Sequence, residues 1–425
     1  MELIVSVIFI LGYLAIAFEH PIRVNKAASA LVTGVLCWTA ITLLSPEKEP
    51  VLESLTDHLG EVSGILFFLL GAMVIVELVD AHDGFEIITE RIKTTNKKKL
   101  VWIIGGITFF LSAVLDNLTT TIVIISLLRK IIPSHKDRLL FAGLVVISAN
   151  AGGAWSPIGD VTTTMLWING QISAGNIILK TFFASLVCFA LPAFVVSLQM
   201  KGKLNKPETT AKKLNSSDSE RRKVFFIGIG ALLFVPVFKT VTHLPPYMGI
   251  LFGLGIMWIL TEMIHSGKDE QDKDVLSVNY ALRKIDSPSI LFFLGILISV
   301  GALQSIGTLH DMAAWMGKSI GDIRIITLSI GLLSSVVDNV PLVAAAQGMY
   351  GLDQFPKDHY FWEFLAYCAG TGGSCLIIGS AAGVAAMGME RIDFFWYLKK
   401  IGWLALIGYL AGAGTYLLQQ YLFHT

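Results

Sequence analysis

The chain has 425 residues, of which 54% are apolar and only 15% charged, and its mean hydropathy is +0.68. A soluble globular protein carries about 25% charged residues, so this composition excludes a water-exposed globular surface and indicates a polytopic helical membrane protein. Thirty-two basic residues balance thirty-two acidic residues. This balance argues against a nucleic-acid partner and leaves the lipid bilayer as the expected surroundings.

Ten apolar runs, bounded by charged residues or by proline and glycine clusters, predict ten membrane crossings. The first run has no basic residues before it and no small-residue cleavage site, so we expect a span and not a signal peptide. The runs cover residues 2–18, 27–44, 63–79, 139–168, 177–199, 224–240, 247–264, 287–305, 359–388 and 395–420.

Two further apolar runs, 101–128 and 325–350, are expected to be re-entrant hairpins because of where the charges lie. Basic residues gather in alternate connections, with eight Lys or Arg between Lys201 and Lys223 and none in 169–176. The positive-inside rule then places the basic connections in the cytoplasm and both termini outside. A single crossing in either extra run would invert every later connection and break this agreement.

Three sequence blocks of the first half recur in the same order in the second half, which indicates an internal repeat. The offsets between the copies are 225, 222 and 220 residues, so the spacing holds as well as the order. Two of the blocks carry polar residues inside apolar runs. The pairs are Ile65–Leu69 with Ile290–Leu294, Leu111–Asn117 with Leu333–Asn339, and Ala149–Gly153 with Ala369–Gly373.

The repeat predicts the fold class, an all-α polytopic membrane protein made of two inverted repeats. Each repeat would hold five crossings and one hairpin, and an odd number of crossings turns the second copy upside down. Inverted repeats with interrupted helices are the architecture of secondary transporters. We predict a first repeat over residues 1–200, a cytoplasmic linker over 201–223 and a second repeat over 224–425.

Two of the crossings, 139–168 and 359–388, are predicted to be discontinuous helices. Ala149–Asp160 holds three glycines and a proline, and Ala369–Ser374 is its glycine-rich counterpart. Such stretches cannot keep their helical hydrogen bonds, and unwound backbone at membrane depth is tolerated only where it lines a cavity or is buried in protein. Free carbonyl groups and half-helix ends are what a dehydrated cation needs.

Each hairpin turn carries an Asp-Asn pair, Asp116-Asn117 and Asp338-Asn339. A carboxylate inside the membrane is costly and is a functional-site hypothesis by default. Because a hard monovalent cation prefers oxygen ligands, hairpin tips that reach the breaks predict an oxygen-lined site. The alternative stays open that Asp116, Asp160 and Asp338 only cap half-helices.

Asp116-Asn117, the block Ala149–Thr164 and Asp338–Pro341 resemble the signature blocks of NhaD-type sodium/proton antiporters. That family lies in an ion transporter superfamily that also contains sodium/dicarboxylate symporters and arsenite permeases. The resemblance implies a homodimer of the inner (plasma) membrane that needs no cofactor and is not an enzyme. It further implies exchange of cytoplasmic sodium or lithium for external protons by an elevator-like movement, in the service of sodium transport and pH homeostasis.

The candidate cation- and proton-binding residues carry oxygen atoms on the hairpins and the discontinuous helices. They are Ser112, Asp116, Asn117, Thr119, Asn150, Ser156, Asp160, Thr162, Thr163, Ser334, Asp338, Asn339, Thr371 and Ser374. Sodium is expected at Asp116, Asn117, Asn150 and Asp160. By the repeat alignment Asp160 corresponds to Ser380, so we expect Asp160, with Asp116, to carry the exchanged proton and Asp338 to be mainly structural.

Two other functions remain as alternatives. A transporter of the same fold for a dicarboxylate or arsenite would not require a carboxylate in its site. Symporters of the superfamily carry Ser-Asn-Thr at the hairpin tips, so the aspartates of this chain favour proton-coupled exchange. A remote alternative is an intramembrane aspartyl enzyme, which would hold Asp116 and Asp338 as a paired dyad.

Three polar segments carry weaker signals. Segment 79–90 alternates charged and apolar residues and predicts an interfacial amphipathic helix. Within it, the resemblance makes His82 a candidate pH sensor, the alternative being a solvated loop histidine. Segments 201–223 and 265–286 are expected to be solvated linkers.

Overall fold

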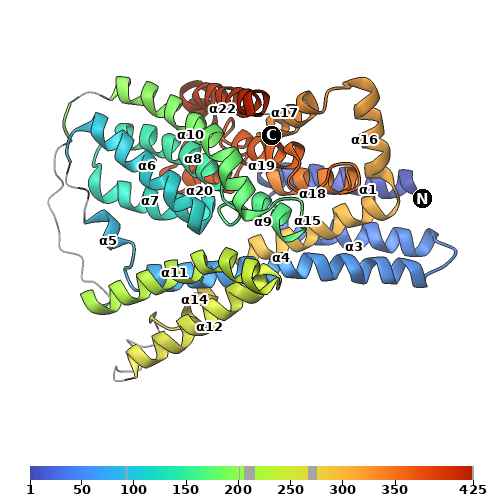
Figure 1. The fold of residues 1–425 in the computed structure, drawn as a ribbon, viewed down its shortest axis with the longest axis horizontal. Helices are drawn as coiled ribbons and strands as arrows, with labels where there is room; N and C mark the ends of the chain where they lie inside the picture. Colours follow the sequence, from blue (N-terminus) through green and yellow to red (C-terminus); the bar gives the residue numbers. More distant parts are fainter. Residues whose placement is uncertain (91, 93, 201, 205–215, 267–274, 424–425) are drawn as a thin grey trace.

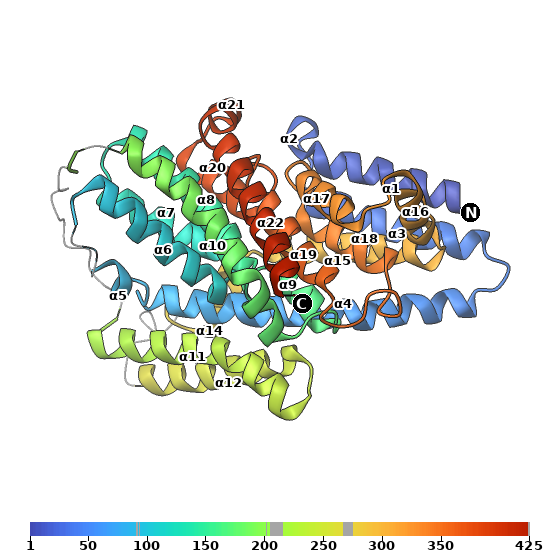
Figure 2. The ribbon, with the colours of Figure 1, turned by 45° about the horizontal axis from the view of Figure 1, so that its top comes forward.

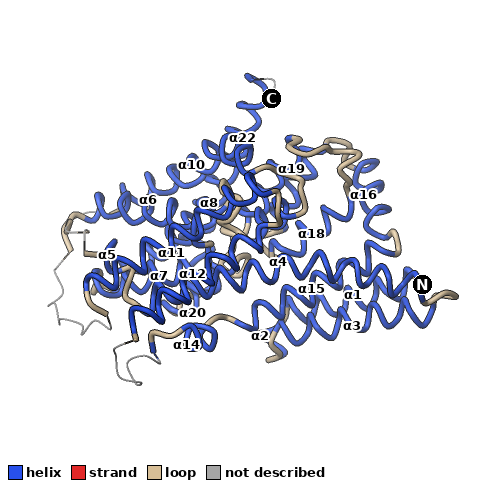
Figure 3. The backbone as a smooth tube through the Cα atoms, turned by 60° about the horizontal axis from the view of Figure 1, so that its bottom comes forward, coloured by secondary structure: helices blue, strands red, loops and turns tan. Residues whose placement is uncertain are grey.

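The computed structural model describes residues 1–90, 92, 94–200, 202–204, 216–266 and 275–423. These residues form helices joined by short connections, and the only strand-like pairing among them is an isolated bridge between Asn96 and Lys203 (Figure 3). The first half contains α1 (Glu2–Ala17), α2 (Glu19–Ile22), α3 (Lys26–Leu44), α4 (Glu49–Ala81), α5 (Glu86–Thr89), α6 (Lys97–Leu115), α7 (Asn117–Ile131), α8 (His135–Gly153), α9 (Val161–Ile168) and α10 (Ala174–Gln199).

The second half repeats this order with a few additions. It contains α11 (Asp218–Thr242), α12 (Pro246–His265), α14 (Val278–Lys284), α15 (Ser287–Ser305), α16 (Thr308–Ser319), α17 (Ile323–Leu333), α18 (Asn339–Met349), α19 (Tyr360–Gly372), α20 (Ala381–Glu390), α21 (Phe394–Tyr397), a π-helical turn η1 (Leu398–Gly402) and α22 (Trp403–Phe423). The α16 helix was not expected from the sequence.

The chain is a multi-pass membrane protein. Within the described residues, eight helical segments are long and apolar enough to cross a bilayer, and seven of them coincide with predicted crossings. The eighth is α6, which is the first arm of a hairpin. Of the other predicted crossings, α1 is a shorter apolar helix of 16 residues and two are interrupted, as the glycine-rich blocks predict.

Both predicted hairpins are present. Asp116 alone separates α6 from α7, whereas residues 334–338 join α17 to α18. Each first arm ends against the break of its discontinuous helix: Ser112 Oγ donates to the Ala149 carbonyl over 2.6 Å, and Ser334 Oγ donates to the Ala369 carbonyl over 2.9 Å. The hairpin therefore turns back at the depth of the break instead of crossing.

Both discontinuous helices are also present, as α8 with α9 and α19 with α20. At each break, glycine lets the hairpin arm approach the helix backbone closely. A Cβ at Gly152 would clash with the Phe109 carbonyl, and a Cβ at Gly372 would clash with the Gly331 carbonyl. These equivalent contacts show that the two halves fold alike.

The halves are also packed against each other reciprocally. In the first half α3 lies along α15 of the second half, and α12 of the second half lies along α4 of the first (Figure 1). Seen from another side, the hairpin α6–α7 and the helices α8 and α10 form one end of the molecule, with α1, α3 and α16 at the other (Figure 2). The confirmed fold class is thus all-helical, with two related halves, two hairpins and two discontinuous helices.

The structure corrects the boundaries of several segments. The acidic connection before the third crossing is not a loop, because α4 begins at Glu49 and runs for 33 residues. At 1.5 Å per residue this helix is about 50 Å long, more than the roughly 30 Å hydrocarbon core. Glu49, Glu53, Asp57 and Glu61 are exposed along its extra turns. Because they are spaced by four residues, they lie on one face of the helix. Hydropathy alone cannot distinguish such a charged helical segment from a loop.

Two polar segments also differ from expectation. Segment 79–90 is not one amphipathic helix, since α4 ends at Ala81, Asp83 adopts a φ of +56°, and the short α5 follows. The predicted solvated segment 265–286 contains α14, whose Val278 and Ala281 are buried. Residues 267–274 of that segment, and 201 and 205–215 of the predicted linker, lie outside the described residues.

Candidate functional site

Three aspartates begin the helices that follow the breaks and the turns. Asp160 caps α9, and its Oδ1 accepts from the backbone N–H and the hydroxyl of Thr162, both at 2.8 Å. Asp116 caps α7 in the same way through Thr119, and Asp338 caps α18 through the Val340 N–H at 3.3 Å. The capping role left open by the sequence is therefore real for all three, and each carboxylate sits at the positive end of a half-helix.

Asp116 differs from the other two in its backbone. Its φ is +95° and its ψ is 160°, a region that is populated almost entirely by glycine. Holding a residue with a Cβ there costs about 1–3 kcal/mol, and such strain persists only where the surroundings fix it. The single-residue turn between α6 and α7 is thus a rigid feature that presents the carboxylate at a fixed place.

Asp160 is the point at which the two hairpin tips meet. Asn117 Nδ2 donates to Asp160 Oδ2 over 2.8 Å, and Asn339 Nδ2 lies 3.4 Å from both carboxylate oxygens. Asp160 as a residue is 2% exposed. One buried carboxylate of the first half therefore receives an amide from each half of the molecule.

Asn150, at the last turns of α8, connects this carboxylate with the second break. Its Oδ1 accepts from Asn117 Nδ2 at 3.0 Å, while its own Nδ2 donates to Ser374 Oγ at 2.8 Å and to Ser380 Oγ at 2.9 Å. Ser380 was recognised only as the counterpart of Asp160 and was not among the predicted site residues. Both breaks and both hairpin tips thus belong to one hydrogen-bonded cluster.

A cavity of about 70 Å³ lies beside this cluster. Asp116, Asn117, Asp160, Asp338 and Asn339 all line it, so the structure brings together the polar tips that the sequence singled out. The rest of the wall is mostly apolar, and α4, α11, α12 and α15 contribute Phe68, Leu232, Ile250 and Phe293 to it.

Lys26 also lines the cavity and was not predicted. Its Nζ lies 3.4 Å from Asp338 Oδ2 and 4.5 Å from the centroid of the Phe292 ring. In the sequence, Lys26 is simply one of the basic residues in the connection between the first two predicted crossings. One feature of the sequence could have indicated it. Lys26 follows the Asn25 cap as the first residue of α3, where a cation is unfavourable because it opposes the helix dipole.

The other predicted residues bind elsewhere. The hydroxyls of Ser112 and Ser334 hold the first hairpin arms to the breaks through hydrogen bonds. Ser156 Oγ donates to the Ala113 carbonyl at 2.5 Å. Thr371 Oγ1 donates to the Tyr367 carbonyl at 2.6 Å within α19. Thr163 Oγ1 donates to the Asp160 carbonyl at 2.9 Å. These hydroxyls hold the backbone of the site and do not line the cavity.

His82 is not a solvated loop histidine. It is fully buried at the end of α4, with Nδ1 2.6 Å from the Leu78 carbonyl oxygen and Nε2 3.3 Å from Nε2 of His265 on α12. The rings are stacked with their centroids 5.0 Å apart. His82 does not line the cavity, and its role as a pH sensor stays a prediction.

A second cavity of about 610 Å³ is lined by neighbouring turns of the same helices. On α4 the 70 Å³ cavity takes residues 68–73 and the larger one takes residues 58–65. On α15 the order is reversed, with residues 289–293 at the first and 297–304 at the second. Because α4 and α15 carry the same repeated block, their opposite directions between the two cavities show the inversion of the halves.

The donor set of the cluster suits a hard cation. It consists of carboxylate, amide and hydroxyl oxygens without sulfur or imidazole, which is the chemistry that alkali ions select. Within the part of the chain that the structure describes, no three His, Cys, Asp or Glu side chains converge as a metal site. A bound alkali ion would therefore draw on amide and backbone oxygens beside one or two carboxylates.

The chain is similar to known membrane transporters. A family model described as citrate transporter matches residues 13–362. Sodium/proton antiporter 1 of Arabidopsis thaliana is 49% identical over 419 residues, which cover 98% of this chain and 72% of that protein. The Na(+)/H(+) antiporter NhaD of Vibrio parahaemolyticus is 30% identical over 90% of this chain and 97% of its own length.

A solved structure shares the fold. The YdaH transporter of Alcanivorax borkumensis, described as having an unusual topology, superposes with a TM-score of 0.57 over 92% of this chain and 95% of that chain. The sequence identity is 10%, so this likeness concerns the arrangement of helices alone.

Proposed function

Since the chain belongs to the NhaD-type sodium/proton antiporter family, we propose that it is a secondary transporter that exchanges sodium, or lithium, for protons across the membrane. The observation that carries the proposal is Asp160, a buried carboxylate that receives one amide from each hairpin tip. A proton and a cation cannot both occupy one carboxylate. Exchange follows if the site crosses the membrane only when one of them is bound.

Asp116 is the second proton- and cation-binding group in this proposal. It lines the same cavity, and its carboxylate is held by the backbone N–H and the hydroxyl of Thr119. Sodium would be held by Asp116 and Asp160 with oxygens of Asn117 and Asn150. Protonation of the carboxylates removes the charge that binds the ion, so the two substrates compete directly.

Alternating access is supported by two cavities that follow one another along the same helices, α4 and α15. The hairpins and the discontinuous helices would move together, because side chains such as Asn150 and Asp160 tie all four to one another. We propose that this unit shifts in an elevator-like manner against α3, α4, α12 and α15. A homodimer in the inner (plasma) membrane would anchor those helices.

The same-fold alternative of a carboxylate substrate is disfavoured by charge. Although the matching family model is described as citrate transporter, three carboxylates and one ammonium line the 70 Å³ cavity. An anionic substrate would meet net repulsion there. The aspartyl-enzyme alternative lacks its dyad, since Asp116 bonds to Thr119 while Asp338 bonds to Val340 and Lys26.

The proposal is tested in everted membrane vesicles energised with a proton gradient and followed with a pH-sensitive dye. Sodium and lithium should each restore the dye signal, whereas potassium, citrate, succinate and arsenite should not. Asp393 caps the short α21 as an exposed aspartate outside the cavity, so Asp393→Asn is a matched control that should retain exchange. A response to citrate, succinate or arsenite without one to sodium or lithium would contradict the proposal.

The proposed orientation places both termini outside. Single cysteines at Glu53 and at Lys212, in a chain without the four native cysteines, should react with an impermeant maleimide from opposite sides. Labelling of both from the same side would rule out this orientation and the ten crossings on which it rests.

A further inference from the structure

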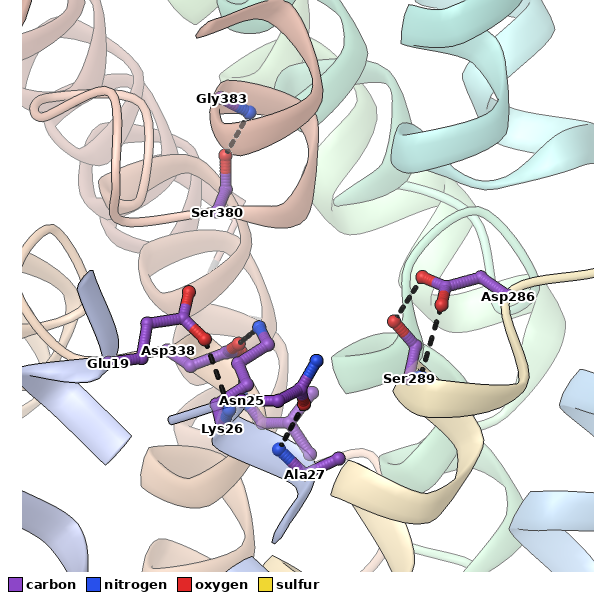
Figure 4. Close-up of polar contacts among 10 residues, drawn as sticks. Glu19, Asn25, Lys26, Ala27, Asp286, Ser289, Asp338, Ser380 and Gly383 are labelled. Carbon is purple, nitrogen blue, oxygen red and sulfur yellow. Dashed lines mark hydrogen bonds and ion pairs between the residues drawn. The ribbon is translucent and has the colours of Figure 1, made fainter. Parts of the chain in front are cut away.

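Lys26 enters the cavity from a helix that belongs to neither the hairpins nor the breaks. Its backbone N–H donates to Glu19 Oε2 at 3.1 Å, and the Ala27 N–H is capped by Asn25 Oδ1 at 2.8 Å (Figure 4). The helix start is therefore satisfied without the lysine side chain. The side chain instead passes over the Phe292 ring of α15 and ends 3.4 Å from Asp338.

This arrangement is unfavourable for a structural lysine alone. An ammonium at the first residue of a helix opposes the helix dipole, and the Lys26 and Asp338 side chains are only 30% and 21% exposed. Desolvation of two partly buried charges offsets much of the attraction between them, so such a pair contributes little to stability. The position therefore has a consequence beyond holding the fold, because the ammonium lines the same cavity as Asp116 and Asp160.

We propose that the Lys26 ammonium is a tethered cation that occupies Asp338 and thereby keeps this carboxylate out of sodium binding. The inference rests on the proposed function and adds the residue that sets the sodium affinity of the site. The sodium ion then has Asp116 and Asp160 as its charged ligands. The pair also explains why the two hairpin aspartates differ in role although they occupy equivalent places in the repeat.

The proposal predicts opposite effects for the two partners. Lys26→Gln frees Asp338 and adds one negative charge to the cavity, so the KM for sodium should fall, on the order of three- to tenfold. Asp338→Asn leaves the ammonium unpaired, so the KM should rise by a similar factor while transport persists. Lys26→Arg keeps the charge and should stay close to the wild-type KM.

The decisive measurement is the double variant Lys26→Gln with Asp338→Asn, assayed for sodium KM and Vmax in the same vesicles. The cavity charge is then restored, and the KM should return to within about twofold of wild type. Lys318→Gln on α16, which removes an exposed lysine elsewhere, is the control for charge removal as such and should leave both constants unchanged.

The outcomes separate this inference from the proposed function. If the wild-type chain shows no sodium-dependent proton movement, the proposed function itself is wrong. If the wild type exchanges but Lys26→Gln lowers only Vmax, or if the KM of the double variant stays as far below the wild-type value as that of Lys26→Gln alone, the tethered-cation role is overturned. Should Lys26→Gln fail to reach the membrane, the rise in KM for Asp338→Asn still decides, since an unchanged KM there refutes the role.

Discussion

The two hairpin tips carry the same Asp-Asn motif but differ in the turn that holds the aspartate and in the partner of its carboxylate. Asp116 turns the chain in a single strained residue and faces the cavity without a basic partner among its hydrogen bonds. Asp338 follows a turn of several residues and pairs with Lys26. At the breaks, Asp160 of the first half stands where the second half has Ser380. The repeat therefore gives two similar halves, and these five side chains make the cluster between them asymmetric.

Replacing the carboxylates should have the largest effect and tests the difference between the two hairpin tips most directly. Asp160→Asn and Asp116→Asn should each lower sodium-dependent proton movement at least a hundredfold, because an amide cannot exchange a proton or offer a charge to the cation. Asp338→Asn should leave a measurable fraction of exchange. Vesicle assays over a range of pH values, with membrane content checked by immunoblot, measure all three variants.

Two results would break this assignment. One is exchange at the wild-type rate in Asp160→Asn. The other is an Asp338→Asn variant as inactive as Asp116→Asn, which would make the two tips functionally equal despite Lys26.

The next largest effect concerns the close contacts at the breaks, where the halves are alike. Gly152→Val and Gly372→Val each drive a side chain into the backbone of the facing hairpin arm, so both should abolish transport. Gly106→Val on α6 is the matched control, since a Cβ there meets nothing within 4 Å. Near-normal exchange in Gly152→Val would show that the hairpin arm does not need to approach the break.

A moderate effect should distinguish the two asparagines. Asn117 donates to Asp160 at 2.8 Å and also to Asn150, whereas Asn339 lies at 3.4 Å from the carboxylate. A hydrogen bond to a charged group contributes about 1.5–3 kcal/mol, so Asn117→Ala should raise the sodium KM roughly tenfold or more. Asn339→Ala should raise it only a few-fold. Equal effects would mean that Asp160 serves both tips alike.

The smallest effect should come from the two serines that hold the hairpin arms, and it should be similar in both halves. Ser112→Ala and Ser334→Ala each remove one hydroxyl that holds a hairpin arm to a break, a loss of about 0.5–1.5 kcal/mol. Both variants should melt a few degrees lower in detergent and keep most of their exchange activity. Loss of exchange in Ser112→Ala with an unchanged melting temperature would instead assign that hydroxyl to the ion.

Much of the fold was readable from the sequence because membrane solvation acts on local composition. Apolar runs of sufficient length must become helices, glycine and proline inside them must interrupt the helix, and repeated blocks mark equivalent elements. The exceptions have physical reasons as well. The extra turns of α4 carry exposed carboxylates, and a helix that leaves the bilayer no longer needs apolar residues.

The candidate site was readable only in part. The aspartates and asparagines at the tips can be recognised in the sequence, because polar groups inside a membrane are costly and therefore indicate a functional site. Which of them meet does not follow from the sequence. Asn339 reaches Asp160 across 179 positions, and Lys26 reaches Asp338 across 312. Neither pairing has any local pattern.

The sequence by itself therefore determined most of the elements, the breaks and the kind of chemistry, because these depend on the residues and their nearest neighbours. The tertiary structure alone decided which carboxylate joins both halves and which is neutralised by a lysine. The reason is that packing of α3 on α15 and of the hairpin tips on the breaks fixes these distances, and the strength of a charge pair depends on distance and burial.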